Sequence, residues 1–306
     1  MRVTIDATGC NVSAWVEALR RESRGDDLRV FKSSSLSRVF GSAGLDFAIR
    51  GSDVFHASPL TPRAPRRAKL TATVEDLSCW LMPELHSPAH IKTAELFAKN
   101  ILEPAHGLIA VSEAARQDAI RLLDIHPDKI TTIYPGVDAT YFDAQPAPRG
   151  RPYVLYAGGG EPRSNSKMLL DAWKGLKPEL RRDYDLIAMD GVPPANLPGL
   201  IAGATLFAHL PLSESFALPV AQAMAAHVAV VISDTSGMPE AGRDAGVMVD
   251  PHSPSAIAAG LTRLLESESE RAKFARYGRA RAEKYRWERC AAESLAFFHR
   301  VLGQKA

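Results

Sequence analysis

The side chains best suited to chemistry lie in two segments of the second half of the chain. In SESFALPVAQAMAAH, residues 213–227, a polar loop carries the carboxylate of Glu214 and leads into a helix expected to begin near Leu218. Unpaired amides and the dipole at such a helix start favour an anion. The carboxylate can accept hydrogen bonds from sugar hydroxyls, or it can cap the helix, and the residues alone leave both interpretations open.

The other segment is YAGGGEPRSNSKMLLDAW, residues 156–173. An expected strand ends in three glycines, Gly158 to Gly160, and a helix is expected to begin near Asn165. Glycines let the backbone approach a ligand closely, the helix start offers N–H groups to phosphate, and Arg163 adds a permanent cation. Three glycines can also form only a tight turn. Because the segment is neither G-x-G-x-x-G followed by an acid nor a Walker loop, it disfavours dinucleotide enzymes and ATPases.

Strand ends must position both segments, and the chain supplies a regular alternation of β-rich runs and helical patterns. This alternation predicts an α/β fold of two doubly wound domains, in which ligands bind at the carboxyl ends of the strands, in the cleft between the sheets. The segment DAQPAPRGRP, residues 143–152, breaks all periodicity and is the expected linker. Strands are expected at residues 2–5, 28–31, 54–56, 70–74, 107–111, 130–133, 153–157, 185–189, 205–209, 228–233 and 247–249.

The composition argues against several classes of function. A formal net charge of +2 over 306 residues argues against nucleic acid as a partner. The cysteines form no C-x-x-C pair and the histidines show no metal spacing, so neither a disulfide framework nor a metal site is expected. The chain enters a strand directly and contains no apolar run as long as a membrane span, so we expect a cytoplasmic protein. The cysteines and histidines concerned are Cys10, Cys79, Cys290, His56, His86, His106 and His209.

In this order and at this separation, the two segments resemble the donor-binding half of retaining nucleotide-sugar glycosyltransferases of the GT-B fold. That group of glycosyl transferases, group 1 and family 4-like, includes bacterial mannosyl- and rhamnosyltransferases. In the first half, TVEDLS is similar to the family's T-V-H-D-L-S, and VSEAARQDAIRLLDIHPDKITTIYPGVD to the segment before its interdomain loop. In the second half, ESFALPVAQAMA, VVISDTSGMPE and DAGVMVDPHSPSAIAAGL match in order, and YRWERCAAESL matches the closing helix.

The resemblance implies an architecture and a set of site residues. Two Rossmann-like domains would face each other across a cleft: an acceptor domain at residues 1–147, a nucleotide-sugar donor domain at 148–285, and a helix at 286–306 that crosses back. Glu214 would contact the transferred sugar, and Arg163 would neutralise the donor pyrophosphate. The implied donor-binding residues are Gly158, Gly159, Gly160, Ser164, Asn165, Lys167, Ser215, Phe216, Ala217, Leu218 and Gln222. The resemblance implies no metal or cofactor, since the nucleotide-diphosphate sugar is a substrate.

Several of these positions depart from the family pattern. Ser164 replaces the lysine of an Arg-Lys pair, and Gln222 replaces the second acid of a Glu-x7-Glu motif that holds the ribose. An amide there loses a charge-assisted pair, a loss of about 1 to 3 kcal/mol in a buried site. Ala217 stands at a usual glycine, and Glu75 occupies the position of the active-site histidine.

Two functions from different classes follow. In the first, the protein moves a hexose of mannose or rhamnose type from a nucleotide-diphosphate sugar to a glycan, lipid-linked or other acceptor with retention of configuration. In the second, it is a catalytically degenerate homologue that binds or scaffolds a partner glycosyltransferase. The basic cluster Arg63, Arg66, Arg67 and Lys69 is either a solvated loop or a surface for an anionic acceptor or the inner face of the membrane. Among the histidines, His209 is expected at a strand end near Glu214.

Overall fold

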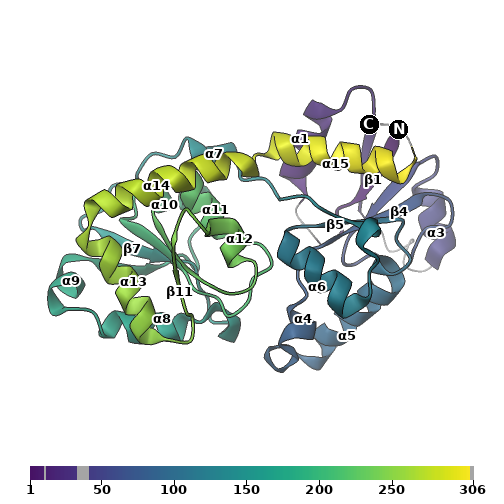
Figure 1. Cartoon of the computed structure of the whole chain (residues 1–306). Coiled ribbons are helices and arrows are strands. Elements are labelled where there is room, and N and C mark those ends of the chain that lie inside the picture. The colour runs from purple at the N-terminus through teal and green to yellow at the C-terminus, as the bar shows by residue number, and fades with distance from the viewer. Residues whose placement is uncertain (10–11, 33–40, 304–306) are drawn as a thin grey trace. The chain divides into compact units, whose positions relative to one another are not determined.

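A computed structural model describes residues 1–9, 12–32 and 41–303 of the chain. These residues form two compact units (Figure 1). The first unit comprises Met1–Gly136 and Trp287–Ala306, and the second unit comprises Val137–Arg286. Cys10 and part of the segment ATGCNVSAW lie outside the described residues.

The first unit is built on a six-stranded parallel sheet in the order β2-β1-β3-β4-β5-β6. Its strands alternate core residues between two faces, because Val54 and Ile109 pack on one face and their neighbours Phe55 and Leu108 on the other. A sheet that is buried on both faces must be covered by helices on both faces, which explains its short apolar runs. The strands are β1 (Arg2–Asp6), β2 (Asp27–Phe31), β3 (Val54–Ala57), β4 (Lys69–Val74), β5 (Gly107–Ala110) and β6 (Ile130–Thr132).

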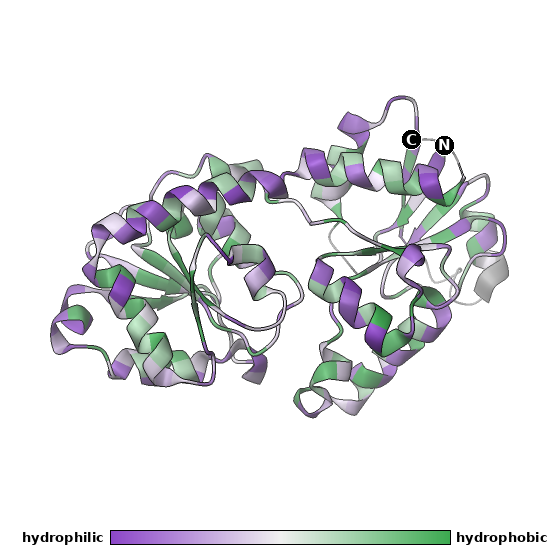
Figure 2. Cartoon of the chain, viewed as in Figure 1, coloured by the Kyte–Doolittle hydropathy of each residue, from purple (hydrophilic) through white to green (hydrophobic). Residues whose placement is uncertain are grey.

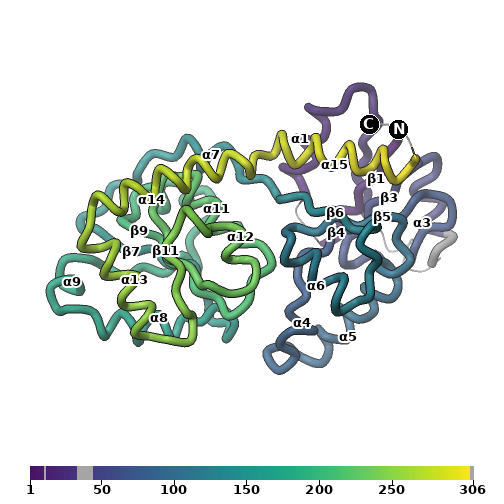
Figure 3. Tube along the Cα trace, viewed as in Figure 1, coloured from purple at the N-terminus to yellow at the C-terminus, as the bar shows by residue number. Residues whose placement is uncertain are grey.

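Helices from both ends of the chain cover this sheet. The trace in Figure 3 shows the closing helix α15 running beside α1, where Phe298 is fully buried in the same core cluster as Leu19. Ser112 caps α6, since its hydroxyl accepts a hydrogen bond from the Ala115 amide at 2.9 Å. The helices and single turns are α1 (Ser13–Glu22), α3 (Gly41–Ala48), α4 (Ser78–Leu81), η1 (Pro83–Leu85), α5 (Pro88–Phe97), η2 (Ala98–Leu102), α6 (Glu113–Leu123), η3 (Pro127–Lys129) and α15 (Trp287–Val301).

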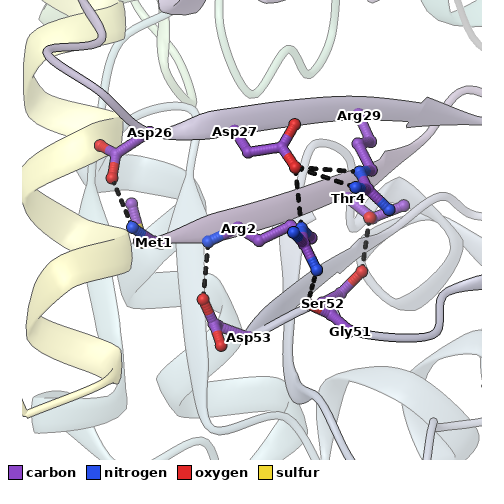
Figure 4. Close-up of polar contacts among 9 residues, drawn as sticks. All are labelled: Met1, Arg2, Thr4, Asp26, Asp27, Arg29, Gly51, Ser52 and Asp53. Carbon is purple, nitrogen blue, oxygen red and sulfur yellow. Dashed lines mark hydrogen bonds and ion pairs between the residues drawn. The ribbon is translucent and has the colours of Figure 1, made fainter.

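A polar network fixes the amino-terminal ends of the first strands (Figure 4). The Arg2 guanidinium donates to Asp27 Oδ2 at 2.7 Å, and its backbone N–H donates to Asp53 Oδ2 at 2.6 Å. The hydroxyls of Thr4 and Ser52 lie 2.7 Å apart. This network lies at the strand ends opposite to those where such folds bind ligands, so we assign it a structural role.

The second unit has a five-stranded parallel sheet in the order β11-β10-β9-β7-β8. Figure 2 shows these strands as apolar and the outer faces of the surrounding helices as mixed with polar residues. The strands are β7 (Tyr153–Tyr156), β8 (Asp185–Ala188), β9 (Leu206–His209), β10 (Val230–Ser233) and β11 (Val247–Val249). The helices and single turns are α7 (Ala139–Phe142), η4 (Pro162–Ser164), α8 (Ser166–Lys174), α9 (Pro178–Asp183), η5 (Pro194–Asn196), α10 (Leu197–Ala202), α11 (Leu218–Ala225), α12 (Met238–Gly242), α13 (Pro254–Glu266), α14 (Glu268–Ala282) and η6 (Glu283–Tyr285).

All the predicted strands are present, with ends that differ by at most two residues, and the α/β prediction is confirmed. The division of the chain differs from the expected boundary at residues 147 and 148, because the second unit already begins at Val137. Phe142 of α7 is buried beneath the guanidinium groups of Arg279 and Arg286, at 4.7 and 3.6 Å from its ring centroid. Residues 143–152 therefore follow an element of the second unit, although their composition is that of a linker.

Candidate functional site

The second unit contains a pocket of about 390 Å³ at the carboxyl ends of β7, β8 and β9. Strand β7 pairs with β8 on one side and β9 on the other, so the strand order reverses here, which is where doubly wound sheets bind ligands. We call this the second-unit pocket. Its lining includes Ala157, Gly158, Gly159, Glu161, Arg163, Ser164, Met189, Asp190, Gly191, Val192, His209, Pro211 and Glu214.

The glycine turn after β7 provides one wall of the second-unit pocket. A Cβ on Gly158 would lie 2.7 Å from Ser166 Oγ, so this position needs glycine for packing. A Cβ on Gly159 would meet only Asp190, at 4.0 Å, and one on Gly160 would meet nothing within 4 Å. Within the described part of the chain, the N–H groups of Gly159 and Gly160 donate no hydrogen bond. The turn therefore offers two free donors beside open space.

Two predicted donor-binding residues next to this turn, Ser164 and Asn165, form hydrogen bonds within the protein itself. Ser164 Oγ lies 2.8 Å from the Gly159 carbonyl oxygen and 2.7 Å from that of Glu161, and so stabilises the turn. The buried Asn165 donates from Nδ2 to the carbonyls of Leu210 and Pro251, at 3.0 and 2.8 Å. Lys167 is exposed on α8 and is not part of the pocket lining.

Arg163 and Glu214 reach the second-unit pocket from different loops. The carbonyl of Arg163 accepts a hydrogen bond from the Leu212 amide at 3.0 Å, which joins the loop after β7 to the loop after β9. The backbone carbonyl of Glu214 accepts from the Gly237 amide at 2.9 Å. A Cβ at Gly237 would lie 2.2 Å from the Ser215 carbonyl oxygen, so only glycine permits this close approach. Two tight loop contacts thus hold the guanidinium and the carboxylate at one site.

The carboxylate of Glu214 does not cap the following helix. Helix α11 begins after Ala217 without a side-chain cap, and Glu214 lines the pocket instead, so the capping interpretation is wrong. Phe216 is buried with its ring edge-on to Tyr285 at 5.3 Å, and Ala217 is fully buried. Ser215, Phe216, Ala217, Leu218 and the half-buried Gln222 are not among the residues that line this pocket.

His209 is a further member of the second-unit pocket. Its Nδ1 lies 3.1 Å from the Ala157 carbonyl, which can only accept, so Nδ1 carries a proton. Its Nε2 lies 3.6 Å from Glu214 Oε2, too far for a hydrogen bond, and within the described structure this buried nitrogen has no partner. A ligand hydroxyl between the two side chains would supply the missing hydrogen bond.

Two acids of this pocket are not among the residues predicted from the sequence. Glu161 and Asp190 line it with Glu214, so three carboxylates face one guanidinium among the lining residues. Asp190 and Gly191 follow β8 after one residue, Met189, and Gly191 has a φ of 76°. An acid and a glycine at the end of a predicted strand could have indicated this position. The excess of carboxylates suits hydroxyl groups, whereas an anionic ligand would depend on Arg163 and the backbone amides.

The first unit has its own pocket of about 150 Å³, lined by Asp6, His56 and Glu75 among others. The buried Asp6 accepts hydrogen bonds from Ser58 and Thr61 hydroxyls at 3.0 and 2.6 Å. Both ring nitrogens of His56 lie near threonine hydroxyls at 3.1 and 3.0 Å, and burial lowers the pKa of His56 to about 3. We call this the first-unit pocket.

Glu75 is the acid of the first-unit pocket that lies nearest to solvent. Desolvation by the surrounding protein atoms raises its pKa, and the charge of the neighbouring Asp76 raises it further. The side chain of Glu75 is exposed by surface area. Cys290, on another wall of the pocket, is buried, and this burial raises the pKa of its thiol to about 12, so it is unreactive at neutral pH.

Comparison with known proteins decides the family. The family model described as Glycosyl transferases group 1 matches residues 187–281, and the model described as Glycosyltransferase Family 4 matches residues 16–141. A sucrose-phosphate synthase from Thermosynechococcus elongatus has the same fold, with a TM-score of 0.76 at 15% identity over 99% of each chain. Anabaena HepE, solved in complex with UDP-glucose, has a TM-score of 0.72 at 16% identity over 97% of this chain and 100% of that one. The chain is a group 1 glycosyltransferase of the GT-B fold.

Curated relatives of this glycosyltransferase include a mannosyltransferase and an inositol 3-phosphate glycosyltransferase. The O-antigen chain mannosyltransferase B of Escherichia coli is 29% identical over 75% of this chain and 70% of that protein. A D-inositol 3-phosphate glycosyltransferase of Salinispora tropica is 26% identical over 74% of this chain and 60% of that protein. The chain spans between about half and 70% of the length of the curated relatives that it matches. Within the described residues, none of its helices combines the length and apolar character that a membrane span requires.

Proposed function

We propose that this glycosyltransferase moves a hexose of mannose type from a nucleotide-diphosphate sugar to a glycan or lipid-linked acceptor, with retention of configuration. The observation that carries the proposal is the meeting of Glu214, Arg163 and the free Gly159 amide in one pocket at the switch point of the second-unit sheet. The mannosyltransferase relative of Escherichia coli favours mannose and a polysaccharide acceptor. The Anabaena protein in complex with UDP-glucose favours a nucleotide-sugar donor as the ligand of this fold.

In this proposal the two sides of the second-unit pocket take different parts of the donor. Arg163 and the N–H groups of Gly159 and Gly160 bind the pyrophosphate and stabilise the charge that develops on it as the glycosidic bond breaks. Glu214 accepts hydrogen bonds from sugar hydroxyls, and His209 Nε2, which faces it at 3.6 Å, accepts another. Because the leaving diphosphate can take the proton of the acceptor hydroxyl, the reaction needs no protein nucleophile.

The remaining predicted residues act at the edge of the site in this proposal. Gln222 holds the ribose with an amide in place of a carboxylate, and Ser215, Phe216, Ala217 and Leu218 set the helix start that lies next to the sugar loop. Glu75 lies in the first-unit pocket, where we propose that the acceptor binds. Ser164 shapes the glycine turn through its hydroxyl and does not replace the charge of a lysine.

A transfer assay with a donor panel tests the proposal. Purified protein is incubated with UDP-, GDP-, dTDP- and ADP-sugars and mannose-terminated acceptors, with and without divalent metal, and product is followed by mass spectrometry. We expect one nucleotide class to support transfer, with the product anomer matching the donor anomer by NMR. Transfer with inverted configuration would refute retention. Failure of every donor, with no gain in donor binding in a Ser164→Lys/Gln222→Glu variant, would refute the donor site and leave a scaffolding role.

A further inference from the structure

Three ligating side chains of the first unit lie together on short elements that follow β4. Cys79 is on α4, His86 ends η1, and His90 is in α5. One ligand atom from each residue lies within 4.8 Å of the other two. None of the three lines either pocket described above. We propose that Cys79, His86 and His90 bind a zinc ion, and we call them the CHH cluster.

The spacing of the CHH cluster is close to that of a zinc site. Zinc bonds of about 2.3 Å to sulfur and about 2.1 Å to imidazole nitrogen place tetrahedral ligand atoms about 3.3 to 3.8 Å apart. Side-chain rotations can close the remaining gap, since two of the three ligands are imidazoles on flexible Cα–Cβ bonds. The rings of His86 and His90 are already stacked, with centroids 5.2 Å apart and an interplanar angle of 14°. The two ligands are therefore held next to each other before a metal binds.

Burial supplies a second, independent observation. Within the described chain, Cys79 is buried and forms no disulfide, and the Nε2 atom of His86 is buried without a hydrogen-bond partner. Buried ring nitrogens in folded proteins nearly always have a partner. A zinc ion bound to the His86 imidazole would provide the partner that its buried nitrogen lacks.

The ligand types indicate which metal binds. A thiolate with two imidazoles is a borderline-soft set, which suits zinc, whereas magnesium and calcium require oxygen ligands. Among the described residues, no further histidine, cysteine or carboxylate belongs to the cluster, so water takes the fourth position. The bound ion would link α4, η1 and α5 and stabilise the segment that follows Glu75. The sequence spacing C-x6-H-x3-H did not indicate this site, because the three residues come together only through the arrangement of α4, η1 and α5.

Cobalt substitution tests the zinc site directly. Untagged full-length protein is stripped with a chelator and titrated with Co²⁺, which we expect to give tetrahedral d–d bands and a thiolate charge-transfer band at one equivalent. Zn²⁺ should abolish both bands and should raise the melting temperature of the protein, with a rise that grows with the logarithm of the free Zn²⁺ concentration above Kd. This readout does not involve sugar transfer, so its outcome is independent of the proposed function.

Variants assign the ligands. His90 is exposed, so His90→Ala should fold, and its metal affinity should fall by more than about 100-fold, since even outer-shell partners contribute about 10- to 100-fold. Cys79→Ser should lose the charge-transfer band. His126→Ala removes an exposed histidine outside the cluster, and Cys290→Ser removes a buried thiol elsewhere; both should keep the bands. A native protein without a thiolate band, or bands that survive in both His90→Ala and Cys79→Ser, would overturn the proposal.

Discussion

The two pockets of this glycosyltransferase use polar groups in opposite ways. In the first-unit pocket the protein occupies them itself: Asp6 accepts four hydrogen bonds between 2.5 and 3.0 Å, and His56 has a hydroxyl near each ring nitrogen. In the second-unit pocket the described residues leave the His209 Nε2 atom and the Gly159 amide without a hydrogen-bond partner. Polar groups with hydrogen-bond partners in the protein make the pocket wall rigid, whereas polar groups without such partners can bind a ligand. The contrast supports our proposal that the polar donor binds in the second-unit pocket.

The largest expected effect on stability comes from the hydrogen bonds that Asp6 accepts in the first-unit pocket. Asp6→Ala removes a buried carboxylate that accepts from Ser58, Thr61 and Thr8, so the free energy of unfolding should fall by about 3 kcal/mol or more. Urea unfolding followed by tryptophan fluorescence measures the loss. Asp128→Ala, whose side chain is 93% exposed, should change stability by no more than about 0.5 kcal/mol. An equal loss of stability in the two variants would contradict the stabilising role of the polar groups in the first-unit pocket.

The next effect concerns the carboxylate of the second-unit pocket. Glu214→Gln keeps the shape of the side chain but weakens its hydrogen bonds to sugar hydroxyls, so we expect kcat/KM to fall about 100-fold, or about 2.7 kcal/mol. Glu161→Gln alters an exposed acid of the same pocket and should cost less than about fivefold. Steady-state kinetics with the active donor compare them. Equal losses would mean that only the total charge of the pocket matters.

The third effect concerns the close backbone contact between Gly237 and the loop that carries Glu214. Gly237→Ala would force its Cβ against the Ser215 and Glu214 carbonyl oxygens, at 2.2 and 2.7 Å, and so displace the loop that carries Glu214. We expect a loss of about 1 to 3 kcal/mol of stability together with weaker donor binding. Gly160→Ala meets no atom within 4 Å and should leave stability nearly unchanged. Thermal melting and donor titration separate the two outcomes. Donor affinity that is intact in Gly237→Ala would contradict the role of the loop.

The smallest effect is a pH dependence at Glu75. Because its pKa in the folded protein is raised above the ordinary 4.5, the folded state binds this proton more tightly, and stability falls as pH rises from about 4.5 through the raised value. Glu75→Gln should therefore gain stability over the wild type at neutral pH but not below pH 4.5. Asp76→Asn should shrink this gain by removing the second cause of the shift. A gain that is the same at all pH values would show that the pKa shift does not produce it.

The sequence predicted the parts of this structure that depend on local pattern. Every strand was found because buried parallel strands are short apolar runs between turns, and Arg163 and Glu214 were placed together because both follow strand ends. Other features depend on contacts between distant elements. The side chain of Asn165 donates hydrogen bonds to two carbonyls of later loops, and Asp190 lines the site from the end of β8. The CHH cluster forms from residues of three short elements. None of these contacts has a periodicity or spacing that a single sequence reveals.

Ligand-induced stabilisation tests the central claim, that the second-unit pocket binds a nucleotide-sugar donor. The melting temperatures of the wild type and of Arg163→Ala are measured with UDP-, GDP-, dTDP- and ADP-sugars, because a ligand that binds only the folded state must raise the melting temperature. We predict a shift with one nucleotide class in the wild type and a much smaller shift in the variant. A flat response at millimolar ligand, or equal shifts in both proteins, would contradict the claim.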